Sequence, residues 1–463
     1  MRRGDSHHNS HGAHAHHAHG HAIHAPAADA AARYERAYGA AQPAPGGRVI
    51  TVDLEAREME WEFVPGRPTR AWGYNGQVPG PVIEARVGDV LEVRLKNALP
   101  EPTTIHWHGL RLPAPMDGTE NVQRPIEPGE TFTYRFALPD AGTFWYHPHT
   151  NETVQLERGL YGALIVRGPG EPELDAERVL VLDDVALDRN GQIKGPGGWI
   201  ERHDGRQGST RLVNGRKEPE LSMAGGQVER WRIVNASSAR YVRLSIGGRP
   251  FRILGTDGGL LAAPVTATEV LLAPADRVDL AVGPFAEGET IAVEALRHSR
   301  GSFAPARRVG LATIRVGPAA PSRARIPAAL RALEPLVAGP TTATREIRLG
   351  FKVSAKRGVD FTINRELHHR ADPVRVGDLQ VWDIVNRSPV DHPFHLHGFF
   401  FQVLEVNGKA PEFLSWEDTV NVPALGRVRI AWVADDRPGE WMYHCHILEH
   451  HAGGMMAHFE VVR

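Results

Sequence analysis

The sequence predicts an all-β protein built from sandwiches or barrels. Residues Thr131–Phe136 (TFTYRF) alternate aromatic and polar side chains, which is the period of a half-buried strand. Similar runs lie at Asp89–Lys96, Val228–Val234 and Arg427–Val433. The 48 Gly and 35 Pro residues interrupt such runs, and long helical patterns are scarce, so an all-β class is favoured.

An internal repeat predicts that these strands form three related domains. The segment VGDVLEVRLKN (87–97) resembles VGDLQVWDIVN (376–386) and, more loosely, GGQVERWRIVN (225–235). In each copy a Gly lies nine residues before an Asn. Repeated supersecondary units indicate repeated domains, and the Pro/Ala-rich stretch 317–340 would link the last two. We place the domains at 46–168, 172–318 and 340–463.

Residues 1–45 precede the first domain, and we predict that they form a disordered tail. They are rich in His, Ala and Gly and have almost no apolar residue to bury. Neutral imidazoles bind copper, nickel and zinc. The tail is therefore either a metal-scavenging segment or a solvated leader without a specific role. No apolar stretch follows Arg2-Arg3, so we expect no signal peptide in this chain.

Charge and cysteine content exclude several classes of partner. The 53 basic and 55 acidic residues leave a net charge of −2, which gives no electrostatic reason to bind nucleic acid or an anionic membrane. No apolar run approaches the ~18 residues of a membrane span. A single cysteine cannot form an internal disulfide and does not reveal the redox compartment. A lone cysteine is most simply a small buried hydrophobe.

His-x-His pairs recur at matching places in the first and third domains. His106 and His395 lie nine residues past the repeat Asn, and each opens such a pair. The second domain has Leu244 and Ile246 there. Further along, GTFWYHPH in the first domain matches GEWMYHCH in the third. The four pairs are His106/His108, His147/His149, His395/His397 and His444/His446.

This arrangement predicts a metal site between the first and third domains. Residues i and i+2 of a strand face the same side, so each pair directs two imidazoles toward one point. One pair could be two ordinary core or surface histidines, but four symmetric pairs indicate a shared site. Imidazole suits zinc, copper, iron and nickel, so histidine alone does not choose the metal.

The segment HCHILEHHAGGMM near the C-terminus favours copper. Cys445, His450 and Met455 are spaced by five and five, and His392 precedes the third histidine pair. Two imidazoles, a thiolate and a weak axial thioether form the ligand set of a blue-copper site. Zinc rarely uses a thioether, and a structural zinc site normally has more cysteines. Met456 is the alternative axial ligand, but the spacing favours Met455.

These motifs resemble those of the three-domain multicopper oxidases, the family of bacterial laccases and cuprous oxidases. The resemblance runs from about residue 48 to the C-terminus and rests on HWHG, WYHPHT, HPFHLHG and HCHILEHHAGGMM. It implies cupredoxin domains, which are Greek-key β-barrels, and four copper ions, three of them between the first and third domains. By position it implies type 1 copper at His392, Cys445, His450 and Met455, and type 2 copper at His106 and His395. It also implies two type 3 ions. The ligands of one would be His108, His147 and His446, and those of the other His149, His397 and His444.

The resemblance also implies an enzyme that couples oxidation of one-electron donors to the four-electron reduction of dioxygen to water. Cuprous-oxidase specialists usually carry a methionine-rich insertion over the type 1 site, and the 7 methionines here form none. We therefore expect an open pocket for phenols or aromatic amines, with Cu(I) as a further candidate donor. The family suggests a periplasmic or secreted protein, and we expect a monomer.

Three alternatives compete with this interpretation. The first is a copper-binding or copper-tolerance protein whose His-rich tail sequesters the metal. The second is a copper nitrite reductase, which would not need four His-x-His pairs. The third is a cell-division-associated relative that has lost its coppers, and such a relative would lack ligands that this chain has.

Asp117 is a candidate catalytic residue. It lies nine residues after His108, where the family has an acidic residue near the three-copper cluster. Our hypothesis is a proton relay, and the alternative is a turn aspartate before Gly118.

Two further positions next to expected ligands are ambiguous. The residue after the type 1 His450 is often acidic in close relatives, but here it is His451, with Glu449 on the other side. His451 could titrate near neutrality or be an exposed histidine, and the second interpretation is favoured. Asp391, beside His392, could orient a phenol or cap a turn.

Overall fold

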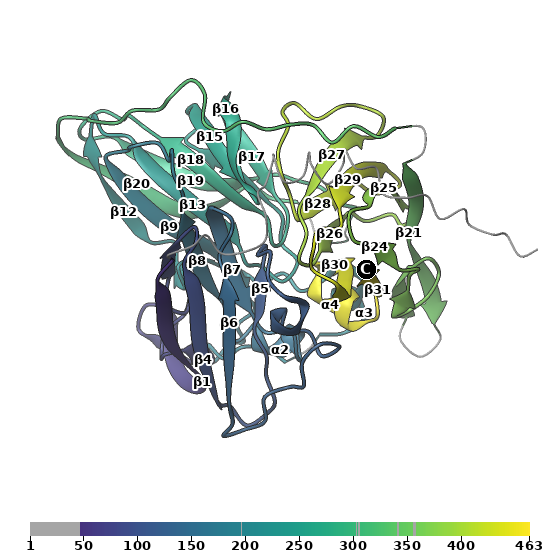
Figure 1. Ribbon diagram of the computed structural model, residues 1–463. Helices are drawn as coiled ribbons and strands as arrows, with labels where there is room; N and C mark the ends of the chain where they lie inside the picture. Colours follow the sequence, from purple (N-terminus) through teal and green to yellow (C-terminus); the bar gives the residue numbers. More distant parts are fainter. Residues whose placement is uncertain (1–46, 196, 302, 304–305, 340–341, 355–357) are drawn as a thin grey trace, which may run out of the picture.

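The computed structural model describes residues 47–463 except 196, 302, 304–305, 340–341 and 355–357. The predicted tail, 1–45, lies outside these residues. Strands dominate the described part, and they form three successive pairs of sheets, coloured purple to blue, teal to green, and green to yellow along the chain (Figure 1). We call these pairs the first, second and third barrels. The predicted all-β class is confirmed.

The first barrel combines a sheet of order β2-β1-β4-β6 with one of order β3-β8-β7-β5. A short 3-10 helix, η1, follows β5, and a short helix, α2, follows β7. Its elements are β1 (Val49–Val64), β2 (Arg67–Tyr74), β3 (Ile83–Arg86), β4 (Val90–Ala98), β5 (His106–His108), η1 (Ala114–Met116), β6 (Thr131–Ala137), β7 (Gly142–His147), α2 (Glu152–Gln155) and β8 (Gly162–Arg167).

The second barrel combines the orders β11-β10-β9-β13-β18-β15-β16 and β12-β20-β19-β14-β17. Helix α3 interrupts it between β9 and β10. Its elements are β9 (Ala176–Val185), α3 (Trp199–Asp204), β10 (Thr210–Val213), β11 (Arg216–Lys217), β12 (Glu220–Gly225), β13 (Glu229–Asn235), β14 (Val242–Ile246), β15 (Phe251–Thr256), β16 (Gly259–Ala267), β17 (Glu269–Leu272), β18 (Arg277–Val282), β19 (Thr290–Leu296) and β20 (Val309–Ala319).

The third barrel combines the orders β22-β21-β25-β29-β27 and β23-β31-β30-β26-β28, and β24 also pairs with β31. Helix α4 lies between β30 and β31, close to α2 and α3. Its elements are β21 (Ala343–Ser354), β22 (Gly358–Ile363), β23 (His369–Arg370), β24 (Val374–Arg375), β25 (Leu379–Asn386), β26 (His392–Leu396), β27 (Phe401–Val406), β28 (Thr419–Val422), β29 (Arg427–Val433), β30 (Gly439–Cys445), α4 (Leu448–Ala452) and β31 (Met456–Val462).

The sequence repeat is a repeat of structure. Its strand, β4, β13 or β25, pairs in parallel with the first long strand of its barrel and antiparallel with a later one. The repeat Gly has a positive φ of 78–89° in all three copies, a conformation that glycine adopts without steric cost. The repeat Asn, at 97, 235 and 386, donates to nearby carbonyls and accepts from the amide two residues on, so it holds the loop that follows.

The predicted strands lie close to the observed ones. β29 has the predicted bounds, while β4, β6 and β13 differ from them by one or two residues. The predicted linker is partly structured, because 317–319 still belong to β20. The domain boundaries remain predictions. None of the helices among the described residues is long and apolar enough to cross a membrane.

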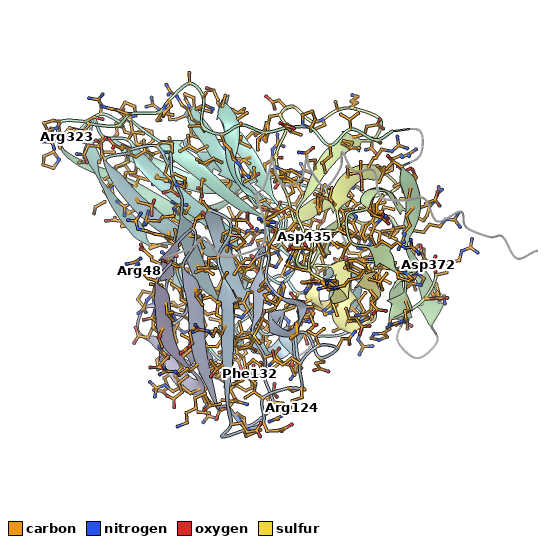
Figure 2. The ribbon with its side chains drawn as sticks, in the orientation of Figure 1. Arg48, Arg124, Phe132, Arg323, Asp372 and Asp435 are labelled. Atoms are coloured by element: carbon orange, nitrogen blue, oxygen red, sulfur yellow. The ribbon has the colours of Figure 1, made fainter. Side chains whose placement is uncertain are left out.

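The first and third barrels also meet through buried charges. Arg111 of the first barrel lies 3.6 Å from Asp435 of the third, which Figure 2 labels near the middle of the molecule. Arg437 pairs with the same carboxylate and donates to the Leu112 carbonyl at 3.0 Å. These contacts fix the relative position of the barrels that carry the histidine pairs.

Candidate metal centres

Strand pairing places the four His-x-His pairs in matching positions. In the first barrel β5 pairs with β7 so that His106 opposes His147. In the third barrel β26 pairs with β30 so that His395 opposes His444. In the second barrel the same ladder, β14 with β19, sets Leu244 opposite Ala295. One strand pair therefore occurs three times, and only two copies carry imidazoles.

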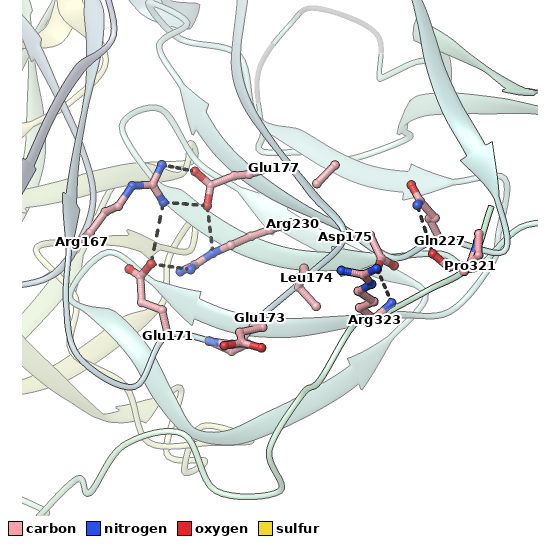
Figure 3. Close-up of a pocket in the computed structure, with 12 residues that line it drawn as sticks. Arg167, Glu171, Glu173, Leu174, Asp175, Glu177, Gln227, Arg230, Pro321 and Arg323 are labelled. Atoms are coloured by element: carbon pink, nitrogen blue, oxygen red, sulfur yellow. Dashed lines mark hydrogen bonds and ion pairs between the residues drawn. The ribbon is translucent and has the colours of Figure 1, made fainter.

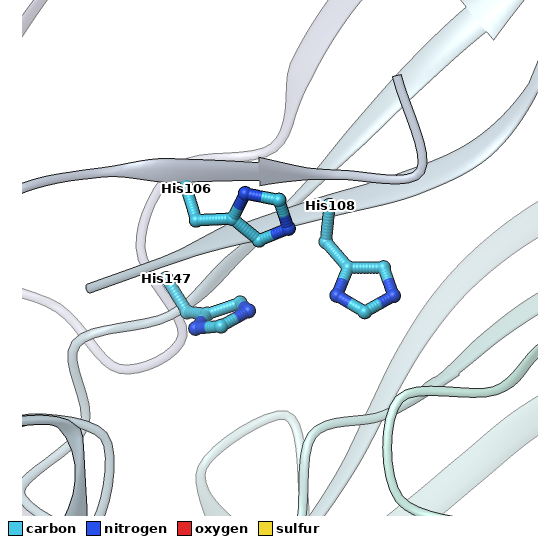
Figure 4. Close-up of side chains that lie close together, drawn as sticks. All are labelled: His106, His108 and His147. Atoms are coloured by element: carbon cyan, nitrogen blue, oxygen red, sulfur yellow. The ribbon is translucent and has the colours of Figure 1, made fainter. Parts of the chain in front are cut away.

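The eight rings converge from both barrels on one buried volume. His106, His108 and His147 lie around a common space at the ends of β5 and β7 (Figure 4). All eight residues are at most 7% exposed. Contacts across the barrels link His106 to His397 with ring centres 4.0 Å apart, His108 to His395 at 3.8 Å, His147 to His446 at 5.5 Å, and His149 to His444 at 5.4 Å.

The outer nitrogens of these rings are held by acceptors that repeat between barrels. A carbonyl can only accept, so each ring nitrogen facing one must carry the proton. Its other nitrogen then presents a lone pair to the interior, as metal-binding histidines require. At 2.9 Å each, His106 donates to the Asp117 carbonyl, His395 to that of Asp418, His147 to that of Pro148, and His444 to that of Cys445.

The inner nitrogens fit metal ions. Buried polar atoms normally have hydrogen-bond partners, yet six of the eight rings present a nitrogen that has none among the described residues. In the other two, His397 Nε2 and His444 Nε2 face each other at 3.0 Å. Burial also lowers the pKa of His108, His147, His149, His397 and His444, which favours the neutral form that binds metal. The unpartnered atoms include Nε2 of His106, His147, His149 and His395, Nδ1 of His108, and both ring nitrogens of His446.

A second cluster lies in the third barrel. His392 Nδ1 is 3.4 Å from Cys445 Sγ, His450 Nδ1 is 3.5 Å from the same sulfur, and the two nitrogens are 3.2 Å apart. All three residues are buried. Burial raises the pKa of the Cys445 thiol to about 12, so a bound cation would be needed to hold it as thiolate.

The contacts of the two methionines favour Met455 as the fourth member of this cluster. Met455 is fully buried in the same core as Cys445, and its carbonyl accepts the Cys445 amide at 3.2 Å. Met456 is partly exposed on β31, opposite His444.

Comparison with known proteins agrees with this geometry. Three family models, each described as multicopper oxidase, match residues 55–171, 177–289 and 343–463. The multicopper oxidase MmcO of Mycobacterium tuberculosis is 32% identical over 487 residues, covering 94% of this chain and 92% of its own length. The cell division protein FtsP of Photorhabdus laumondii is 30% identical and covers 87% of both chains. A solved multicopper oxidase from Campylobacter jejuni, described as a metallo-oxidase, superposes with a TM-score of 0.81 at 32% identity, covering 91% of this chain and 94% of its own.

The chain belongs to the multicopper oxidase family. It is therefore an oxidoreductase that uses copper ions and is built from cupredoxin domains, as the sequence resemblance implied.

Asp117 lies where the sequence analysis expected it, inside this multicopper oxidase and against the histidines. Its Oδ2 accepts from His397 Nδ1 at 2.8 Å. Its Oδ1 lies 3.3 Å from His106 Nδ1 but accepts no hydrogen bond from the described residues. The position before Gly118 also forms a tight turn, as the alternative interpretation of Asp117 expected.

Sequence analysis missed the counterpart of Asp117 in the third barrel. Asp418 accepts from His108 Nε2 at 3.0 Å through its carboxylate, and from His395 through its carbonyl. Asp117 follows His106 by 11 residues, whereas Asp418 follows the equivalent His395 by 23. The unequal spacing hid the correspondence.

The second barrel also contributes to the oxidase's centre. Arg277, fully buried at the start of β18, donates from two nitrogens to the Asp418 carboxylate. The same guanidinium donates to the carbonyls of Thr143 on β7 and Asp257 in its own barrel, at 3.1 and 3.2 Å. The barrel without a His-x-His pair therefore supplies the cation that holds Asp418, the carboxylate that contacts His108.

The favoured interpretation of His451 as an exposed histidine is wrong. His451 is only 3% exposed, and its ring contacts the carboxylate of Glu152 at the start of α2. Its ring lies 4.3 Å from that of His444 and 4.9 Å from that of His149. Its neighbour Glu449 instead accepts the Arg206 amide at 3.0 Å.

Asp391 is occupied by structural contacts. Its carboxylate accepts from Asn421 Nδ2 at 3.0 Å and from the Ala424 amide at 2.8 Å, and it lies 3.5 Å from His298. It therefore caps the loop before β29, and this geometry favours the turn interpretation over phenol orientation.

A further cleft lies away from both clusters. It has a volume of about 730 Å³ beside the start of β9, and Figure 3 shows its charged lining. Arg167 is 2.9 Å from Glu177, and Arg230 is 3.1 Å from Glu171. The guanidinium groups of Arg167 and Arg230 are thus paired with carboxylates of the protein itself.

Proposed function

We propose that this protein is a laccase-like oxidase with four coppers, which transfers electrons from small aromatic donors to dioxygen. The observation that carries the proposal is the cluster of eight buried imidazoles with inward-facing nitrogens, joined by one residue to a Cys-His-His triangle. The proposed ligands are His392, Cys445, His450 and Met455 for type 1 copper, His106 and His395 for type 2, and His108, His147 and His446 and His149, His397 and His444 for the type 3 pair.

Cys445 is the proposed connection between the two clusters. Copper would supply one-electron chemistry at the Cys-His-His triangle and dioxygen reduction at the histidine cluster. Cys445 sits between His444 and His446 in the chain, so its backbone joins a residue of the triangle to two residues of the histidine cluster. The His444 ring also donates to the Cys445 carbonyl, which adds a second contact between them.

The donor would bind beside α3 and α4. We expected an open pocket over His450, but α3 covers it, and His450 Nε2 donates to the His203 carbonyl at 2.9 Å. A cleft of about 230 Å³ adjoins this point, lined partly by Phe361, whose ring packs 3.9 Å from that of His450. Trp199, 57% exposed, lies at the outer end of α3. Phe361 is the one aromatic residue among those that line the cleft, and its ring would pack against a small phenol or aromatic amine.

Asp117 is the proposed proton relay. It contacts rings on both sides of the cluster and keeps one carboxylate oxygen without a hydrogen bond. Such an oxygen can hold and release a proton next to the reduced oxygen species.

Copper-loaded turnover with recorded oxygen uptake tests the proposal. A phenol, an aromatic diamine and Cu(I) should be compared, and we expect a blue protein that is fastest with the aromatic donors. Cys445→Ser should abolish the blue band and donor oxidation while leaving the fold and most cluster copper in place. A blue wild-type protein that consumes no oxygen with any donor would refute the oxidase function.

The alternative is copper sequestration by the His-rich tail, which the nine histidines within residues 1–45 favour. Deleting residues 1–45 separates the two functions. The oxidase proposal predicts unchanged turnover per loaded protein, whereas sequestration predicts a large loss of bound copper. Size-exclusion chromatography of the same samples tests the expected monomer. Copper content also separates this protein from a cell-division role without copper, because every proposed ligand is present.

A further inference from the structure

A buried arginine of the second barrel lies against the proposed type 1 site without a counter-ion. Arg300 is 4% exposed, and neither terminal nitrogen of its guanidinium has a hydrogen-bond partner among the described residues. Buried charges are normally paired, because an unpaired one loses its hydration without compensation. The position of this charge therefore needs an explanation.

The backbone fixes Arg300 against the loop that carries His392. The Arg300 carbonyl accepts the Asp391 amide at 2.8 Å. At the next residue, Gly301, a Cβ would lie 1.9 Å from the Pro389 carbonyl oxygen, and φ is +79°. Only glycine tolerates this approach, so the segment is held closely on the loop.

Two carboxylates, Asp204 and Asp391, act on the Arg300 charge from a distance, and neither forms an ion pair with it among the described residues. Asp204 accepts from His203 Nδ1 at 2.8 Å and from the Phe303 amide at 3.1 Å. The guanidinium carbon lies 5.8 Å from the centre of the Tyr241 ring, and the Tyr241 hydroxyl donates to Asn421 at 2.9 Å. Asn421 in turn occupies one oxygen of Asp391, whose other contacts are the Ala424 amide and His298. Both carboxylates are thus held by other donors, and the Arg300 guanidinium has no direct counter-ion among the described residues.

The guanidinium lies next to the strands that carry the proposed type 1 ligands. It is over the Tyr241 ring, whose hydroxyl donates to Asn421 on β28. Asn421 opposes Pro393 on β26, the residue after His392. The charge of Arg300 also acts on Cys445, His392 and His450.

We propose that Arg300 raises the reduction potential of the type 1 site, and so sets which donors the oxidase can oxidise. The inference rests on the proposed type 1 ligands. A thiolate, two neutral imidazoles and a copper ion carry one positive charge less after one-electron reduction. A fixed cation nearby therefore favours the reduced site. It offsets part of the low potential expected from a methionine axial ligand.

Anaerobic redox titration of the blue band in the copper-loaded full chain tests this. Arg300→Met should shift the one-electron equilibrium about tenfold toward the oxidised site, which is about 59 mV for one electron. Arg300→Lys should keep a potential near that of the wild type. Arg297→Gln, three residues away and exposed, is the matched control and should leave the potential unchanged.

Thermal unfolding of the copper-free variants separates an electrostatic from a structural role. Removing an unpaired buried charge should leave the Tm of Arg300→Met unchanged or higher. An unchanged potential in Arg300→Met, or loss of its blue band with a lowered Tm, would overturn the proposal. A wild-type protein without a blue band would instead refute the type 1 site itself.

Discussion

Asp117 and Asp418 occupy matching places on the two sides of the histidine cluster, yet their surroundings differ. Each carbonyl accepts from the histidine that opens the first His-x-His pair of its own barrel, and each carboxylate accepts from a histidine of the other barrel. Arg277 binds both oxygens of the Asp418 carboxylate. Asp117 has no such cation, and its Oδ1 accepts no hydrogen bond from the described residues.

The difference separates two tasks that one carboxylate could not perform together. Burial by itself would raise the pKa of Asp418, but Arg277 and His108 reverse this effect and hold it well below its usual range. Asp418 therefore remains an anion at ordinary pH and can orient a ring but not exchange protons. Asp117 keeps an oxygen available for a proton. One side of the cluster maintains geometry, and the other is suited to proton transfer.

The largest effect is expected at Asp117. Asp117→Asn keeps an acceptor for His397 Nδ1 but cannot carry the proton, so turnover should fall on the order of 100-fold or more. The blue band and copper content should stay at wild-type levels. Steady-state oxygen uptake with metal analysis checks this, and wild-type turnover in the copper-loaded variant would exclude a relay at Asp117.

At Asp418 we expect the opposite pattern. Asp418→Asn should weaken copper binding in the cluster about 10–100-fold, because His108 loses the carboxylate that orients it. It also leaves the Arg277 charge uncompensated, so the variant should be less stable by about 3–5 kcal/mol. Competition with a copper chelator and thermal unfolding measure the two effects.

A double variant serves as the control for Asp418. Asp418→Asn combined with Arg277→Met should be more stable than Asp418→Asn alone, because it removes the unpaired cation. Strictly additive losses would show that Arg277 does not act through Asp418.

Glu157 gives a smaller, pH-dependent prediction. It tests whether a buried carboxylate stays charged only when a cation binds it directly. Burial raises its pKa to about 8, although Arg206 lies 3.6 Å away. Between its ordinary pKa of 4.5 and about 8 the folded protein holds a proton that the unfolded chain releases. The free energy of unfolding should therefore fall as pH rises through this window, by up to about 1.4 kcal/mol per pH unit.

Glu157→Gln should remove this slope. The Tm of the variant minus the Tm of the wild type should increase from about pH 5 to about pH 8, and thermal unfolding at these two pH values measures it. Parallel pH profiles for the two proteins would mean that Glu157 is already ionised in the fold.

The sequence predicted the strands and the histidine pairs because both follow short-range periodicity. Alternation marked β6 and β29, and the Gly-to-Asn spacing revealed three copies of one strand whose caps the structure shows. The pairs His106/His108 and His395/His397 needed only the two-residue period of a strand.

Contacts set by packing between barrels could not be predicted in this way. Asp418 and Arg277 are 141 residues apart, and neither belongs to a local pattern. His451 is buried because it packs against Glu152, which lies in another barrel. Helix α3 covers His450, and no motif in the sequence predicted this helix.

The shared strand ladder has a consequence for how the barrels assemble. Counting five residues past His147, Ala295 and His444 gives Glu152, Arg300 and Glu449, a charged residue in every copy. Each contacts a barrel other than its own. Glu152 contacts His451, Arg300 contacts the loop before His392, and Glu449 contacts Arg206. A barrel excised from the chain would expose such a group or bury it without its neighbour. The three barrels are therefore not interchangeable, and we expect each to reach its native structure only when the other two are present.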